Sequence, residues 1–249
     1  GWMCMAGTLA ALSAARGFGG GHGILDGERG FHLMAGSDRF DLDRATADLG
    51  TRWLVTEAEP KTFPAIARNT PPHLATSALV AEHGFGPDEV ERVTVRGMQM
   101  DAVADFAPAT EVDAQFSLPY AIVTALLSQP PSPDMFSHDR LFDPEVRRLL
   151  GLVRLEPDAE ADRLYFDEQR LRDSVEVELT DGRRLVRDVE FPRDRPETGW
   201  PEISNKFRTL CDGVLSDTQI ERAIELVDGL DHLENVDPLV GTLVSKTPT

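Results

Sequence analysis

The strongest constraint on the fold is an alternating segment in the second half of the chain. In residues 174–180, Val175, Val177 and Leu179 alternate with Glu176 and Glu178. Residues 183–189 are expected to form the second strand of the pair, and Asp181-Gly182 between them is a typical hairpin turn. Other segments, such as 73–83 and 220–230, repeat their apolar residues at helical spacing. A chain that carries both patterns predicts an α+β fold.

The expected domain organisation follows from where these patterns lie. We expect residues 1–55 to be the remnant of a helical domain, 56–200 to form an α+β domain, and 201–249 to be helices that return to the helical domain. Prolines mark an irregular connection near the first boundary, at positions 60, 64, 71 and 72. The fold class is therefore part of an all-helical domain interrupted by a smaller α+β domain.

The first fifteen residues are small or apolar on every side. A helix of this kind is expected to be buried, and no capping residue precedes it. This pattern predicts the later part of something longer, or one subunit of a split protein. The glycine-rich segment 17–23 is expected to cap the helix and then to form a close-packed turn.

Local signals place the remaining elements. We expect a short helix over 41–49, a strand over 92–96 with Val93 and Val95 on one side, an apolar helix over 116–128 ended by prolines 130 and 131, a helix opened by Asp143, and a capping box from Ser216 to Gln219. The apolar stripe after the capping box, and a similar one from Phe207 to Val214, are expected to pack in the core.

Composition narrows the classes of partner. The chain has 249 residues, of which 25 are Lys or Arg and 43 are Asp or Glu, so its net charge is −18. Nucleic acids and anionic membranes attract basic surfaces, so we expect neither as a partner. No apolar run reaches the ~18 residues of a membrane span, and the start lacks the pattern of a secretory signal. Two distant cysteines exclude a disulfide framework, and we expect a cytoplasmic protein.

Motif spacing argues against several kinds of site. The segment 17–23 does not fit G-x-G-x-x-G, and neither G-x-x-x-x-G-K-[ST], H-E-x-x-H nor G-x-S-x-G occurs. His73 and His83 would lie ~15 Å apart along one helix and ~80° apart around it, so they cannot share a metal ion. We therefore expect no metal site and no covalent serine or cysteine chemistry.

Two segments place polar groups in apolar surroundings. His73 follows Pro71-Pro72 at an expected helix start, where the helix dipole favours a neutral imidazole that can accept a proton. Ser117 and Tyr120 are three residues apart, so their hydroxyls can share one side of a helix start. Each also has a structural interpretation: a solvated histidine, and a tyrosine that satisfies a core hydrogen bond. The residues alone favour the structural interpretation.

Four segments, taken in order, resemble the MmgE/PrpD family. The most specific is Ala114 with Phe116-Ser117-Leu118-Pro119-Tyr120, which is similar to the family's A-x-F-S-L-P-Y segment. Lys61-Thr62-Phe63-Pro64 with the later His73 and Ala78 is similar to its K-x-[YF]-P…H…A segment. Residues 14–31 resemble its helix end and following turn, and residues 201–207 its C-terminal return. The resemblance covers the whole chain but only about the second half of a family member.

The resemblance implies a fold, a site and a chemistry. Family members combine an all-helical domain with a smaller α+β domain, hold the active site between them, and are typically homodimers without a cofactor. Their shared chemistry is proton abstraction next to a carboxylate. The family histidine corresponds to His73 and the family tyrosine to Tyr120, with Lys61 and Ser117 as candidates for substrate binding. A further family lysine would precede Gly1, and the stretch from Pro64 to His73 is longer than in a decarboxylase of the family.

Three hypotheses follow. The first is a dehydratase or decarboxylase, that is a lyase, acting on a small di- or tricarboxylate. The second is an epimerase or isomerase of the same family, which would return the proton to the other face of the carbon. The third is a non-catalytic fragment or subunit that needs a separate helical partner chain.

Overall fold

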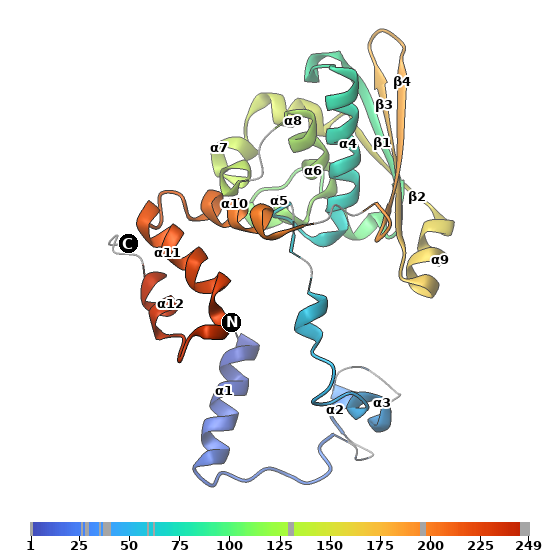
Figure 1. The fold of residues 1–249 in the computed structure, drawn as a ribbon. Coiled ribbons are helices and arrows are strands. Elements are labelled where there is room, and N and C mark those ends of the chain that lie inside the picture. The colour runs from blue at the N-terminus through green and yellow to red at the C-terminus, as the bar shows by residue number, and fades with distance from the viewer. Residues whose placement is uncertain are drawn as a thin grey trace. The chain divides into compact units, whose positions relative to one another are not determined.

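The computed structural model describes residues 2–25, 27, 30–34, 36, 41–58, 60, 61, 63–128, 132–194 and 198–244. The chain forms two units, Gly1–Glu59 and Pro60–Thr249, and each is described by itself. Both are drawn in Figure 1. Among the described residues, no helix has the length and apolarity that a bilayer span requires.

The first unit contains helices joined by long connections. They are α1 (Trp2–Ala15), α2 (Phe31–Met34), α3 (Leu42–Thr46) and the 3₁₀ turn η1 (Leu54–Glu57). Asp41 caps α3 by accepting a hydrogen bond from the backbone N–H of Arg44 at 2.9 Å, which confirms the short helix expected there. The segment 14–31, which resembles the family's helix end and following turn, lies partly outside the described residues, at positions 26, 28 and 29.

The helix α1 forms as predicted, but the prediction that it is buried is wrong for this chain. None of its residues is buried, and Trp2 is 74% exposed. A helix that is apolar all round is buried only where other elements surround it, and the described part of this unit supplies only short helical turns. Gly17, at a φ of 87°, ends the helix as expected. The turn after it is not close-packed, because a Cβ at Gly19, Gly20 or Gly21 would meet nothing within 4 Å.

The second unit is built on a four-stranded sheet of order β2-β1-β3-β4. The strands are β1 (Val90–Gly97), β2 (Val153–Pro157), β3 (Leu171–Leu179) and β4 (Arg184–Phe191). Strands β3 and β4 form the predicted antiparallel hairpin, and its turn uses Gly182 at a φ of 87°. The strand β1 is also confirmed, while its parallel partner β2 was not predicted.

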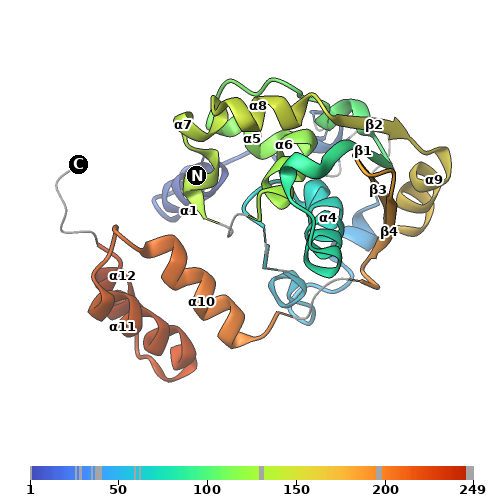
Figure 2. The ribbon, with the colours of Figure 1, turned by 90° about the horizontal axis from the view of Figure 1, so that it is seen from above.

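Helices cover one face of this sheet and form the core with it. The helix α4 (Thr70–His83) packs on β3 and β4, and α6 (Leu118–Leu126) packs on α4. Figures 1 and 2 show these two helices and α8 (Pro144–Leu150) on one side of the sheet and α9 (Ala159–Glu168) on the other. Four valines that share one face of the sheet are completely buried: Val93, Val95, Val175 and Val177.

Short elements connect the core. They are η2 (Ala67–Asn69), η3 (Pro87–Glu89), η4 (Met100–Val103), α5 (Glu111–Phe116), η5 (Pro133–Phe136) and α7 (His138–Leu141). Asp143 caps α8 as predicted, since its side chain accepts from the backbone N–H of Glu145 at 2.8 Å. The apolar helix expected over 116–128 is confirmed as α6, which begins after its N-cap Ser117, while Phe116 ends α5. Prolines 130 and 131 lie outside the described residues.

The unit ends in a helical segment. It contains α10 (Trp200–Cys211), α11 (Asp217–Asp228), the turn η6 (Leu230–His232) and α12 (Asp237–Thr242). The capping box of Ser216 and Gln219 is confirmed. Ile220 and Ala223 are buried as predicted, but Val227 and Leu230 at the end of the same stripe are 41% and 44% exposed. Val214 is 56% exposed, so both stripes are only partly covered. A mixture of helices with a four-stranded sheet confirms an α+β fold; the interruption of a helical domain stays a prediction.

Candidate active site

His73 lies in the first turns of α4, buried and without a hydrogen bond. The helix begins directly after η2, with Pro71 in its first turn, and ends at Gly84, whose left-handed φ of 65° stops it. The His73 side chain is 6% exposed, and neither Nδ1 nor Nε2 has a hydrogen-bond partner. Burial lowers the pKa of His73 to about 4. The imidazole is therefore neutral at physiological pH and has a free lone pair.

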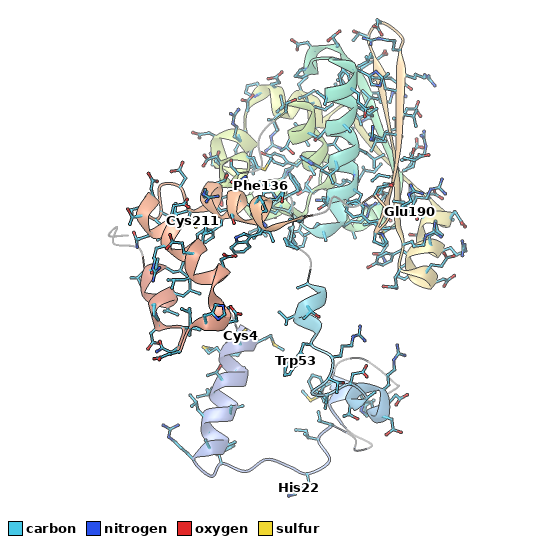
Figure 3. The ribbon with its side chains drawn as sticks, viewed as in Figure 1. Cys4, His22, Trp53, Phe136, Glu190 and Cys211 are labelled. Atoms are coloured by element: carbon cyan, nitrogen blue, oxygen red, sulfur yellow. The ribbon has the colours of Figure 1, made fainter. Side chains whose placement is uncertain are left out.

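A row of aromatic rings connects His73 to Tyr120. The Phe63 ring stacks on the His73 ring with centroids 4.0 Å apart. Phe136, which Figure 3 labels, lies 6.2 Å from Phe63 and 5.9 Å from Tyr120, measured between ring centroids. The two predicted acid–base residues thus belong to one cluster, with phenylalanine rings between them. Thr62, in the same segment, lies outside the described residues.

Tyr120 is almost completely buried. It lies in the first turn of α6 and is 1% exposed, and its hydroxyl donates a short hydrogen bond to the carbonyl oxygen of Met135. Burial raises the pKa of Tyr120 to about 12. The phenol is therefore protonated at physiological pH and is a hydrogen-bond donor, engaged with the backbone in this conformation.

Ser117 holds the start of α6. Its Oγ accepts from the backbone N–H of Tyr120 at 3.0 Å and donates to the carbonyl oxygen of Asp105 at 2.6 Å. A serine in the N-cap position satisfies a backbone donor that the helix itself cannot. The Ser117 hydroxyl thus positions Tyr120 through the backbone, and a role in substrate binding stays a prediction.

Lys61 lies at the exposed start of the segment that carries Phe63. Its Nζ donates to the carbonyl oxygen of Ala65 at 2.9 Å, and its own carbonyl oxygen accepts from Lys206 Nζ at 2.6 Å. The ammonium of Lys61 therefore folds back on its own segment. Contact with a substrate carboxylate would require that this single hydrogen bond be exchanged.

The sequence did not reveal a buried ion pair beside this site. Arg68, in η2, binds Asp173 of β3 through two hydrogen bonds, Nη1 to Oδ2 at 2.9 Å and Nη2 to Oδ1 at 2.7 Å. The Arg68 side chain is 12% exposed and that of Asp173 is fully buried. A signal was available, because position 173 belongs to the inward-facing set of its strand with Val175 and Val177. An acidic residue at such a position needs a buried partner.

Asn69, the next residue, is also buried and was also missed. Its Nδ2 donates to the carbonyl oxygen of Gln115 at 3.5 Å, while its Oδ1 has no hydrogen-bond partner. It precedes His73 by one helical turn, so the two side chains project from the same side of the helix start. Unpaired polar atoms therefore gather at this end of α4.

Residues 70–232 match the family model of the MmgE/PrpD C-terminal domain. The chain belongs to the MmgE/PrpD family. The matched range begins at the first residue of α4 and includes both His73 and Tyr120, while Lys61 precedes it.

Two curated relatives of this MmgE/PrpD chain are cis-aconitate decarboxylases. The chain is 27% identical to the one from Mus musculus over 95% of its own length and 50% of the relative. It is 31% identical to the one from Aspergillus terreus over 55% of its own length and 28% of the relative. The chain thus spans about half of the first relative's length, or less of the second.

The MmgE/PrpD chain shows no candidate metal centre in the residues that the structure describes. Within them, no group of three or more His, Cys, Asp or Glu side chains is placed to hold an ion. The thiols of Cys4 and Cys211 are free.

Proposed function

We propose that the protein is a lyase that acts on a small di- or tricarboxylate by proton transfer at a carbon next to a carboxylate. The observation that carries the proposal is the buried, unpaired and neutral imidazole of His73 at the start of the matched family domain. A buried polar group without a partner costs folding free energy. A functional role gives a reason for such a group to be retained.

The protonation states of the two candidates suit this chemistry. Neutral His73 can accept a proton, and protonated Tyr120 can donate one or can hydrogen-bond to the developing negative charge. Tyr120 would exchange its bond to Met135 for one to the substrate. Lys61 is the proposed contact for a substrate carboxylate, because an ammonium can form charge-assisted hydrogen bonds with it.

Decarboxylation of cis-aconitate is the first reaction to test, because both curated relatives carry that name. In that step the bond between the substrate carbon and the carboxylate carbon breaks, and carbon dioxide leaves. The bonding electron pair stays on the substrate carbon, which then takes up a proton. An epimerase of the same family would move only protons and would release no carbon dioxide. A homodimer in the cytoplasm remains part of the proposal.

A second candidate rests on α1. The exposed apolar residues of this helix, such as Trp2 and Met3, support a chain whose activity needs a helical partner region or chain to cover them. The measurement is the mass of the native complex. A complex with a second chain supports this candidate, whereas a well-folded monomer that turns over substrate contradicts it.

The test of the lyase uses the complete protein and two matched pairs of variants. We expect His73→Ala and Tyr120→Phe each to reduce carbon dioxide release from cis-aconitate by about 10²-fold or more. The controls are His83→Ala, at the exposed end of the same helix, and Tyr165→Phe, the other tyrosine of the chain. Wild-type rates in both site variants would contradict the assignment. A panel of other polycarboxylates, followed by ultraviolet absorbance and optical rotation, separates a dehydratase from an epimerase.

A further inference from the structure

The guanidinium of Arg68, in η2, forms hydrogen bonds through all three of its nitrogens. Besides its two bonds to Asp173, its Nε and Nη2 donate to the carbonyl oxygen of Met98 at 3.2 Å and 3.0 Å. The guanidinium thus ties η2 both to β3 and to the segment that follows β1. The two charged residues are 105 positions apart in the sequence.

Gly97 makes room for this arrangement. It is the last residue of β1 and pairs with Asp173 across the sheet. A Cβ at position 97 would lie 1.9 Å from Asp173 Oδ1 and 2.9 Å from Arg68 Nη2. The carboxylate therefore occupies the space that any other side chain at position 97 would need.

Stability alone is a weak explanation for such a pair. Removing two charges from water costs several kcal/mol per ion, and apolar residues of similar volume are often as stable or more stable. A bidentate pair fixes direction and distance, which an apolar contact does not. Here the pair fixes the position of η2, the short helical turn directly before α4, relative to β3.

His73 depends on that entry. Its ring has no hydrogen bond of its own, so the position of its nitrogens depends on packing, including the stack on Phe63, and on the position of the helix backbone. Arg68 precedes His73 by five residues. It lies in η2, which leads directly into α4, the helix that carries His73. A shift of η2 would be passed on to the imidazole.

We propose that Arg68 and Asp173 are a positioning pair that fixes the start of α4 and thereby holds the His73 imidazole in place for proton transfer. The catalytic consequence rests on the proposed function; the effect on the His73 ring does not. In this proposal both residues act through the helix, because their hydrogen bonds join η2 to β3 and to the Met98 backbone.

The test replaces the pair by apolar residues of similar size, Arg68→Met with Asp173→Leu, in the complete protein. We expect kcat on cis-aconitate to fall about tenfold to a hundredfold, with KM changed less than about twofold, because misplacement of a reacting group affects the chemical step. In nitrogen-15 NMR spectra, assigned with His73→Gln, the His73 ring signals should shift or split into more than one environment. Arg68→Lys, which keeps the charge but not the fork, should recover part of kcat.

The matched control is another bidentate pair between two elements, Arg208 of α10 and Glu221 of α11, at 2.6 Å and 2.8 Å. Arg208→Met with Glu221→Leu should leave both kcat and the His73 signals unchanged. If the apolar pair does not fold, Gly97→Ala tests the same arrangement without removing a charge.

Three results would overturn the inference: unchanged kcat in the folded apolar variant, unchanged His73 signals in it, or equal effects in the control pair. If the wild-type protein turns over none of the polycarboxylates, the proposed function fails. The His73 signals of the variants then still decide whether the pair positions the ring.

Discussion

His73 provides a quantitative prediction that needs no substrate. The pKa of this histidine falls from 6.5 in its ordinary state to about 4 in the folded protein, because the ring is buried. Between these pH values the unfolded chain binds a proton at the ring and the folded chain does not. The free energy of unfolding must then fall as the pH falls from 6.5 toward 4. The stability that depends on a neutral His73 ring is fully present only above the ordinary pKa of 6.5.

The size of the effect follows from the shift. One pKa unit corresponds to about 1.4 kcal/mol. The His73 ring alone should therefore reduce the free energy of unfolding by about 2 kcal/mol between pH 7 and pH 5, and by about 3 kcal/mol between pH 7 and pH 4. The variant His73→Leu lacks this ring and should lose stability less steeply over the same range.

The assay is urea unfolding followed by circular dichroism, at pH 7, 6 and 5, for the parent chain, His73→Leu and the control His83→Leu. The carboxylates titrate in all three proteins, so the difference between parent and variant isolates the ring. Any cavity left by the substitution changes the free energy of unfolding by the same amount at every pH. A parent–variant difference that stays constant within about 0.5 kcal/mol from pH 7 to pH 5 would refute the reasoning, as would an equal effect of His83→Leu.

Three further predictions concern the residues around the site, and each is checked by the midpoint and slope of urea unfolding. Gly97→Ala should destabilise the protein by about 2–4 kcal/mol, because the new methyl group displaces the Asp173 carboxylate from its partner; a neutral effect would mean that the carboxylate has another place to go. Ser117→Ala should cost about 1–2 kcal/mol through the lost cap of α6, whereas Ser117→Thr should be milder. Tyr120→Phe should cost only about 1 kcal/mol for its bond to Met135, so a loss of turnover about 10²-fold in a folded variant would separate catalysis from stability.

The elements that the sequence predicted are those whose signals are local. The hairpin of β3 and β4 joins strands that are adjacent in the chain, and its turn residues specify the register. The caps at Asp143 and Ser216 depend only on residues two or three positions away. Strand β2 was missed because it is short and its partner β1 lies about 60 residues earlier. No local pattern specifies such a pairing.

The site divides in the same way. The segments that carry His73 and Tyr120 could be picked out from residue types and family resemblance. Their surroundings could not, because the stacking of Phe63 and the bond from Tyr120 to Met135 depend on how distant segments pack. The burial of α1 was predicted from its composition alone, and composition does not say whether other elements are present to cover a helix.

The order of the sheet has a consequence for the chain as it is being made. Arg96 of β1 and Glu176 of β3 form a cross-strand bond, yet they are 80 residues apart. At a synthesis rate of about 5–20 residues per second, β1 leaves the ribosome about 4–16 s before β3 exists to pair with it. Until β2 has also been made, both edges of β1 lack a partner strand, and the edge that pairs with β3 stays open until the end of the interval. An open strand edge is a condition under which nascent chains associate with one another or with chaperones. Pairing of β3 with β4 is local by comparison, so we expect the hairpin to form before it docks on β1.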